Sequence, residues 1–209
     1  MKIFVGDTRS SKRIPFLQEN AIGRMLVDRK VNLYPGEIWA WDNGAYRDWQ
    51  SGCNMRGPDY ESLILSRIER VYDLGKPYLA VLPDLVGKGN ESLEYSLSWF
   101  DKLPEEWPWY LALQDGMDPG LVIGAIGTCP IQGFFLGGTD EFKKEAELWC
   151  IRAHHLKLYF HYGRAGTLGK IIHAKMIGAD SLDSSFPLWS MERFRSFGKI
   201  IQHDVFDFN

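Results

Sequence analysis

The sequence has few cysteines, and their spacing excludes two kinds of small stabilised domain. Only Cys53, Cys129 and Cys150 occur in 209 residues, and no two of them form a CxxC pair. A zinc ribbon needs clustered cysteines, and a disulfide framework uses an even number of them. No His/Cys cluster has the spacing of metal ligands either. We therefore expect free thiols in a reducing compartment, with neither a metal site nor a cofactor.

Long hydrophobic runs and an excess of one charge are also lacking. No apolar run approaches the ~18 residues that span a bilayer, and the N-terminal residues 1–13 have no apolar segment typical of a signal peptide. We expect no membrane association and a cytoplasmic location, in the host cytoplasm if the chain is viral. The 24 Lys and Arg against 27 Asp and Glu give a net charge of -3. This balance argues against a nucleic-acid coat protein but leaves a local basic groove open.

What the sequence does contain is typical of one soluble globular domain. Its 209 residues favour a single domain over residues 1–209. The 45% hydrophobic and 24% charged fractions are ordinary for this class. The 8 Trp, 9 Tyr and 12 Phe are a large aromatic content, which must line either a core or a cleft.

Short apolar runs alternate with longer helical patterns along the whole chain. The expected strands are residues 3–5, 38–41, 78–82, 109–113, 133–136, 158–161, 180–183 and, more weakly, 199–202. The expected helices are residues 60–74, 92–103, 118–128, 139–156, 167–177 and 189–197. About eight strand-helix units without a break in composition predict a parallel sheet closed into a compact (β/α)8 TIM barrel. The main rival is a doubly wound open sheet. The chain is short for a barrel, so some helices must be abbreviated.

Polar residues or glycines follow most of the expected strands. In a parallel barrel these strand ends meet at one face, where catalytic residues gather. An Asp after a strand is often a helix cap or part of a turn, but Asp42 and Asp183 lie in sequences that do not resemble caps. Gly137 and Gly138 form either a plain turn or a place where backbone N–H groups approach a ligand.

Six of these segments resemble, in the same order, segments of the tRNA-guanine transglycosylase superfamily, and within it the DNA-modifying 7-deazaguanine transglycosylases. Asp-Asn-Gly-Ala-Tyr is similar to the family's Asp-Ser-Gly-Gly-Phe, and Gly-Ala-Asp-Ser-Leu-Asp-Ser to its Gly-Val-Asp-Met-Phe-Asp-Cys. The resemblance spans about residues 38–190, and its segments are residues 42–46, 83–84, 114–116, 135–138, 161–166 and 178–184.

The resemblance implies a base exchange on a sugar. Asp183 would attack C1′ and hold the sugar covalently while guanine leaves, and Asp42 would move a proton to and from the base. Asp84 would accept hydrogen bonds from the guanine N1–H and amino group. The other expected substrate-binding residues are Gln114 and the amides of Gly137 and Gly138 for O6 and N7, together with His161. Tyr46 or Phe135 either stacks on the base or packs in the core. The candidate cations for a phosphate are Arg9, Lys12, Arg13, Arg47, Arg164, Arg193 and Arg195.

The implied partners are guanine-containing DNA, flipped or single-stranded, and a free 7-deazaguanine base such as preQ0. The clustered zinc ligands of the tRNA enzymes have no counterpart here, which favours DNA over tRNA. Three alternatives stay open: an N-glycoside hydrolase or nucleoside-level enzyme, a tRNA-acting transglycosylase, and a non-catalytic nucleic-acid-binding barrel. An accessory protein that positions the DNA is also left open.

Overall fold

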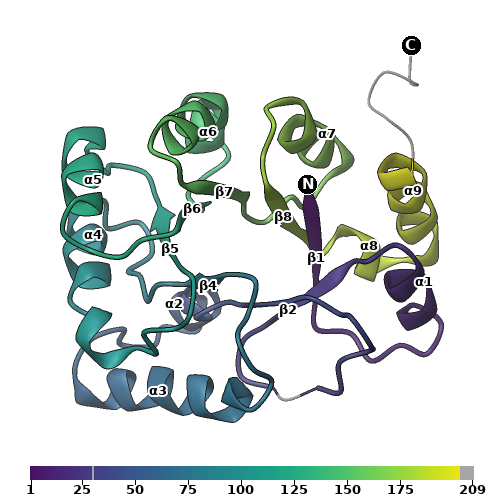
Figure 1. Cartoon of the computed structure of the whole chain (residues 1–209), viewed down its shortest axis with the longest axis horizontal. Coiled ribbons are helices and arrows are strands. Elements are labelled where there is room, and N and C mark those ends of the chain that lie inside the picture. The colour runs from purple at the N-terminus through teal and green to yellow at the C-terminus, as the bar shows by residue number, and fades with distance from the viewer. Residues whose placement is uncertain (30, 203–209) are drawn as a thin grey trace.

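A computed structural model describes residues 1–29 and 31–202 of the chain. Eight parallel strands close into a barrel in the order β1 to β8, with helices around the outside (Figure 1). The strands are β1 (Lys2–Gly6), β2 (Gly23–Leu26), β3 (Trp39–Trp41), β4 (Ala80–Val81), β5 (Trp109–Leu113), β6 (Gly133–Leu136), β7 (Tyr159–Tyr162) and β8 (Ser181–Ser184). The predicted TIM barrel is confirmed, and the open doubly wound sheet is wrong because β8 pairs with β1.

Seven of the expected strands are present, but the eighth is not the one expected. The weak candidate at residues 199–202 is helical and forms the end of α9 (Met191–Gln202). The strand that the sequence did not predict is β2, which has the sequence Gly-Arg-Met-Leu. β2 contains the charged residue Arg24, which is buried. Arg24 forms an ion pair with Glu37, with its Nε 2.6 Å from the carboxylate.

Helices and 3-10 turns connect the strands. They are α1 (Ile14–Glu19), α2 (Ala45–Gln50), α3 (Pro58–Tyr72), α4 (Asn90–Leu97), η1 (Phe100–Lys102), α5 (Pro119–Ile126), η2 (Phe142–Glu145), α6 (Ala146–His155), α7 (Leu168–Met176), α8 (Phe186–Trp189) and α9. Several are short, as the chain length predicted. The segment 139–156 begins with the 3-10 turn η2 and becomes α-helical only at Ala146. Thr139 caps this turn, because its Oγ1 accepts a hydrogen bond from the Phe142 amide at 3.2 Å, while its own amide donates to Asp115 at 2.8 Å. In the part of the chain described here, no helix has both the length and the apolar character needed to cross a bilayer.

The core has two layers that follow the alternation of the strands. Phe4, Ala40, Val81 and Ala112 pack together in one small cluster. Their strand neighbours belong to the larger cluster, as alternation about the sheet requires. Gly133 makes room in the barrel, because a Cβ atom there would lie 2.4 Å from the ring of Tyr110. The small cluster is the barrel interior, and it supports the site from below.

Much of the aromatic content lies in the larger cluster. Trp39, Trp41, Trp107 and Trp109 contact one another with ring centroids 5.6–6.0 Å apart. Three of these four pairs have the edge-to-face geometry that aromatic rings favour. These residues are core, whereas Tyr46 and Trp49 on α2 are 43% and 52% exposed.

Candidate active site

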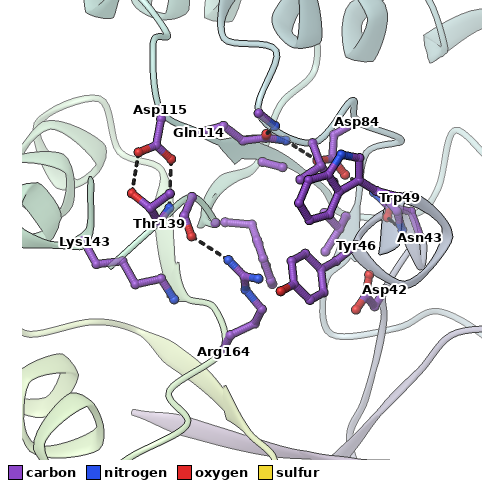
Figure 2. A pocket seen from close by; sticks show the side chains of 18 of the residues that line it. Asp42, Asn43, Tyr46, Trp49, Asp84, Gln114, Asp115, Thr139, Lys143 and Arg164 are labelled. Atoms are coloured by element: carbon purple, nitrogen blue, oxygen red, sulfur yellow. Dashed lines mark hydrogen bonds between the residues drawn. The ribbon is translucent and has the colours of Figure 1, made fainter. Parts of the chain in front are cut away.

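The carboxyl ends of the strands surround a cavity of about 630 Å³. Most of the expected site residues line it, and Figure 2 shows several of their side chains converging on it from different strand ends. The expected residues in its lining are Asp42, Tyr46, Asp84, Gln114, Phe135, Gly137, Gly138, Arg164 and Asp183. The prediction that separate strand ends meet at one site is therefore confirmed, although their chemical roles stay predictions.

Asp183 is held in place by β7 and the residues after it. Its Oδ1 accepts a hydrogen bond from the Arg164 amide at 2.9 Å and lies 3.1 Å from His161 Nε2. His161 Nδ1 lies 2.8 Å from Ser181 Oγ. A ring that donates from Nε2 to the carboxylate and accepts from the Ser181 hydroxyl satisfies both contacts. These two contacts orient Asp183.

His161 does not occupy the position expected of a substrate-binding residue. Its side chain is fully buried and is not in the cavity lining. The ring stacks on Phe135, with centroids 4.8 Å apart and planes 13° apart. His161 therefore contacts Asp183 from below, and Phe135 packs against His161 as well as lining the cavity.

Asp42 directly follows β3. Its amide bonds the Leu26 carbonyl at 2.8 Å, and its Oδ1 accepts a hydrogen bond from Gly44 at 2.9 Å. Gly44 has a φ of 80°, and a Cβ atom there would contact Val27 at 2.8 Å. Burial raises the pKa of Asp42 despite the Gly44 hydrogen bond, and the negative charge of Asp183 raises it further. Asp42 is therefore suited to carry a proton.

Asp84 is a buried acceptor that the surrounding structure orients. Asp84 is only 7% exposed. Its Oδ1 accepts a hydrogen bond from Asn43 Nδ2 at 2.6 Å, and its Oδ2 accepts one from Gln114 Nε2. Burial raises the pKa of Asp84 to about 7, against the lowering effect of the Asn43 hydrogen bond. A carboxylate has about four lone-pair positions, so each oxygen can still accept one more hydrogen bond.

Two expected ligand contacts are already used within the protein. Gln114 Oε1 accepts from the Gly87 amide at 2.6 Å while its Nε2 bonds Asp84, so Gln114 orients Asp84 instead of reaching a ligand. The Gly137 amide donates to the Leu113 carbonyl at 3.0 Å and continues the barrel hydrogen bonding. The expectation that this amide binds a base is therefore wrong.

Backbone conformation and close packing favour glycine at position 138. Its φ is 69°, and a Cβ atom would lie 2.5 Å from the ring of Phe142 and 2.8 Å from Asp115. Its carbonyl accepts a hydrogen bond of 2.5 Å from Arg164 Nη2. The Arg164 guanidinium lies 4.4 Å from the centre of the Tyr46 ring. Arg164, in the loop after β7, thus contacts both Gly138 and Tyr46, and Figure 2 shows its guanidinium beside the Tyr46 ring.

Lys143, which no sequence pattern singles out, also lines the cavity. This residue is only 4% exposed, and its Nζ donates a hydrogen bond to the Gly163 carbonyl. Burial and the positive charge of Arg164 lower the pKa of Lys143 to about 7. Its sequence, Phe-Lys-Lys-Glu, is typical of an exposed helical turn, so it contains no signal that would have revealed a buried amine.

A second cavity of about 430 Å³ lies beside the first. It is lined partly by Gly6, Met25, Arg29 and Arg47. Both cavities are lined by Asp42, Arg164 and Asp183. The two expected catalytic carboxylates therefore lie where the cavities meet.

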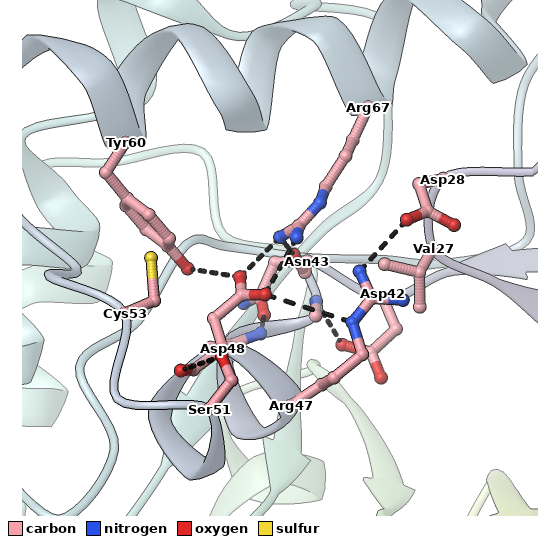
Figure 3. A network of polar contacts seen from close by, with 12 residues as sticks. Val27, Asp28, Asp42, Asn43, Arg47, Asp48, Ser51, Cys53, Tyr60 and Arg67 are labelled. Carbon is pink, nitrogen blue, oxygen red and sulfur yellow. Dashed lines mark hydrogen bonds and ion pairs between the residues drawn. The ribbon is translucent and has the colours of Figure 1, made fainter.

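A buried polar network fixes the segment that begins with Asp42 and Asn43. Arg67 on α3 binds both carboxylate oxygens of Asp48 on α2, at 2.5 and 2.8 Å, and donates to the Asn43 carbonyl at 2.8 Å (Figure 3). The Tyr60 hydroxyl donates to Asp48 at 3.0 Å. Asn43 in turn bonds the Leu82 carbonyl at 2.7 Å. The network links α2 and α3 to the acceptor Asp84.

Within the described residues, no group of three or more His, Cys, Asp or Glu side chains is arranged to hold a metal ion. Comparison of the chain with models of protein families gave no match, and comparison with curated proteins gave none either.

Proposed function

We propose that this protein is a base-exchanging transglycosylase that replaces guanine in DNA with a 7-deazaguanine base of the preQ0 type. The observation that carries the proposal is the position of Asp42 and Asp183 at the junction of two cavities. A glycosidic bond joins two bulky parts, a base and a sugar-phosphate. An enzyme that cleaves it needs a space for each part, with carboxylates at the bond between them.

The larger cavity suits the base. Asp84 lies in its wall with acceptor capacity left, and guanine presents two adjacent donors, N1–H and the exocyclic amino group. Adenine presents an acceptor at N1, so the same carboxylate would reject it. Because only the charged form of Asp84 accepts both hydrogen bonds, its pKa of about 7 makes base binding sensitive to pH near neutrality.

The residues allow a balanced two-step exchange. In the first step an Asp183 oxygen attacks C1′, the C1′–N9 bond breaks, and its electron pair leaves with guanine, which takes the proton from Asp42. In the second step the Asp42 carboxylate removes the N9 proton of the incoming base, and N9 attacks C1′ and releases Asp183. Asp42 suits the first step because its raised pKa favours the protonated form. No net acid, base or oxidant is needed.

Features of the mouth support a nucleic-acid strand as the substrate. A base in a duplex cannot enter a barrel mouth, so it must be flipped out or lie in a single strand. The exposed rings of Tyr46 and Trp49 offer stacking surfaces, and Arg47, which is 54% exposed, is a candidate for a phosphate. The choice of DNA over tRNA comes from the sequence, in which the clustered zinc ligands of the tRNA enzymes have no counterpart.

Labelled guanine tests the proposal directly. Wild-type protein is incubated with a guanine-containing single-stranded DNA, the matching duplex or a tRNA, together with radiolabelled guanine or labelled preQ0. We expect label in DNA, loss of at least about 10³-fold of the rate in Asp183→Asn, and an adduct of wild-type protein with DNA on a denaturing gel. Asp101→Asn, which removes an exposed carboxylate on η1, is the matched control and should exchange normally.

Each alternative gives a different result. Release of free guanine without incorporation identifies a hydrolase, and label in tRNA alone identifies a tRNA-acting enzyme. Binding of DNA without release or incorporation identifies a non-catalytic barrel. Full exchange activity in Asp183→Asn would refute the covalent mechanism.

A further inference from the structure

Lys143 is a buried amine to which the two-step exchange assigns no role. It lies in η2 and lines the larger cavity, yet it is only 4% exposed. Across the described residues, no carboxylate lies within ion-pair distance of its Nζ, and its hydrogen bond goes to the Gly163 carbonyl. Burying a cation without a carboxylate partner destabilises a fold. An ion pair that stabilises the barrel therefore does not explain Lys143.

The Gly163 carbonyl belongs to the same peptide unit as the Arg164 amide. A trans peptide unit is planar, so its carbonyl and its N–H point in opposite directions. The carbonyl accepts the hydrogen bond from Lys143, and the N–H donates to Asp183 Oδ1 at 2.9 Å. Figure 2 shows Lys143 extending toward the segment that contains Arg164. Lys143 and Asp183 are therefore linked through a single peptide unit.

This peptide unit is tightly packed and adopts an unfavourable conformation. A Cβ atom at Gly163 would lie 2.6 Å from the ring of Phe135 and 2.7 Å from the Leu136 carbonyl. Arg164 has a φ of 52°, in the left-handed region that residues with a Cβ atom rarely adopt. Such a conformation persists only where the surrounding contacts hold it, and it is common at functional sites. The hydrogen bond from Lys143 is one of these contacts.

The contacts of Asp183 show what the peptide unit controls. The Arg164 amide and His161 Nε2 both contact Oδ1. No hydrogen bond from a described residue reaches Oδ2, which leaves this oxygen for an attack on C1′. The contacts at Oδ1 thus set the rotation of the carboxylate. A cation at the Gly163 carbonyl polarises the peptide unit, which makes its N–H a stronger donor.

We propose that Lys143 is a positioning residue for the reacting carboxylate. It holds the Gly163 carbonyl so that the Arg164 amide keeps Asp183 oriented with Oδ2 toward C1′. The inference rests on the proposed function, since it takes Asp183 to be the nucleophile. Lys143 acts only through the peptide unit, so its loss should reduce the rate of the chemical step and leave substrate binding unchanged.

The first test does not depend on activity. The backbone amide of Arg164 is followed by NMR in ¹⁵N-labelled protein between pH 5.5 and pH 8.5. Burial and the positive charge of Arg164 lower the pKa of Lys143 to about 7. In wild type the amide proton should therefore move downfield, with a midpoint near pH 7, as the amine gains its proton.

Three variants assign this titration. Lys143→Met has no donor and should abolish it, whereas Lys143→Arg is charged throughout and should keep the downfield position at every pH. Lys144→Met is the matched control, because Lys144 is 72% exposed and pairs with Glu141. It should titrate like wild type. If Lys143→Met does not fold, the comparison of wild type with Lys143→Arg decides, because arginine does not titrate in this range.

Other groups near the amine do not reproduce this pattern. The charged or titratable groups that face it are Arg164, Lys170, Asp140, Asp183 and Tyr162. The hydrogen bond from Lys170 lowers the pKa of Asp140, and burial raises the pKa of Tyr162, so neither changes charge near pH 7. His161 also contacts Asp183 and is titratable. It is present in every variant, so comparison of the variants isolates Lys143.

The second test uses the exchange of labelled guanine into DNA. Lys143→Met should lower kcat by roughly 10- to 100-fold, the effect of a misoriented reacting group, with little change in KM. Lys143→Arg should recover part of kcat. The ratio of kcat between wild type and Lys143→Met should be larger at pH 6 than at pH 8.5, because a neutral amine is the weaker donor. Asp42 and Asp84 are present in both proteins, so their titration cancels in the ratio.

An Arg164 amide that does not titrate in wild type, or that titrates equally in Lys143→Met, would overturn the inference. An unchanged kcat in Lys143→Met would do the same. If no protein exchanges guanine, the transglycosylase proposal fails, whereas the Arg164 titration still decides whether Lys143 acts on the contact with Asp183. Exchange without that titration refutes only the role of Lys143.

Discussion

Replacing Arg67 with methionine should destabilise the protein strongly, because it leaves Asp48 charged and buried. Arg67 is 3% exposed and Asp48 is 6% exposed. In the variant, Asp48 would keep the hydroxyl of Tyr60 and the more distant Arg47, whose Nε lies 3.8 Å from Oδ1. It would lose two hydrogen bonds from the guanidinium, and the Asn43 carbonyl would lose a third. Removing one partner of a buried ion pair costs about 3–5 kcal/mol.

For a chain of this size, each 1 kcal/mol shifts the melting temperature by about 2–4 °C, so we expect a decrease of roughly 6–20 °C. Thermal and urea unfolding followed by circular dichroism at pH 7 measure the change. The control is Arg56→Met, which breaks the exposed pair of Arg56 with Glu91, whose side chains are 53% and 52% exposed. It should cost at most about 1 kcal/mol.

The double variant Arg67→Met with Asp48→Leu should recover part of the loss, since no uncompensated charge remains. A loss of less than about 1 kcal/mol in Arg67→Met alone would refute the reasoning. Such a result would mean that water or a rearranged side chain replaces the hydrogen bonds that Asp48 loses, and that the network does not hold Asn43 in place.

Two further predictions concern titration and exposure. The pKa of Asp84 in the folded protein, about 7, lies above its ordinary value of 3.8. The raised pKa therefore stabilises the folded protein below pH 4, and this stabilisation is lost as the pH rises through about 7. Between pH 4 and pH 8, the free energy of unfolding of Asp84→Asn, measured with urea, should increase relative to that of wild type by up to roughly 4 kcal/mol. A difference between the two proteins that does not depend on pH would contradict this prediction. A thiol reagent at pH 8 should label exposed Cys53 rapidly in the native protein and leave Cys150 unlabelled, because Cys150 is 1% exposed and burial raises its pKa to about 11; equal labelling of both would show that α6 opens readily.

The sequence predicted the barrel because the strand-helix alternation is a local pattern. Residues 109–113 and 133–136 were predicted with the observed bounds, since each is an apolar run between turn residues. β2 could not be found in this way, because Gly23 and Arg24 make half of it and Arg24 is neutralised by Glu37 from a later segment. The run 199–202 looks like a strand only in isolation, since it continues the amphipathic face of α9.

The site could be predicted only as far as polar residues follow strands. Asp42 directly follows β3, Asp84 lies in the loop after β4, and Asp183 lies within β8; all three line the cavity. The partners of Gln114 and the Gly137 amide depend on other strands and loops, so no local pattern shows that these groups are already hydrogen bonded. The Lys143 amine bonds the carbonyl of Gly163, which is distant in the sequence, so no local pattern shows that Lys143 is buried.

The closure of the barrel by β1 and β8 has a consequence for synthesis of the protein. Phe4 of β1 pairs in register with Asp183 of β8, so the barrel closes only after β8 has been synthesised. A growing chain acquires Asp42 and Asp84 early, but the carboxylate that we expect to react reaches its position only when the two most distant strands join. Under the proposed function, an unfinished chain that ends before β8 would carry Asp42 and Asp84 but could not break a glycosidic bond.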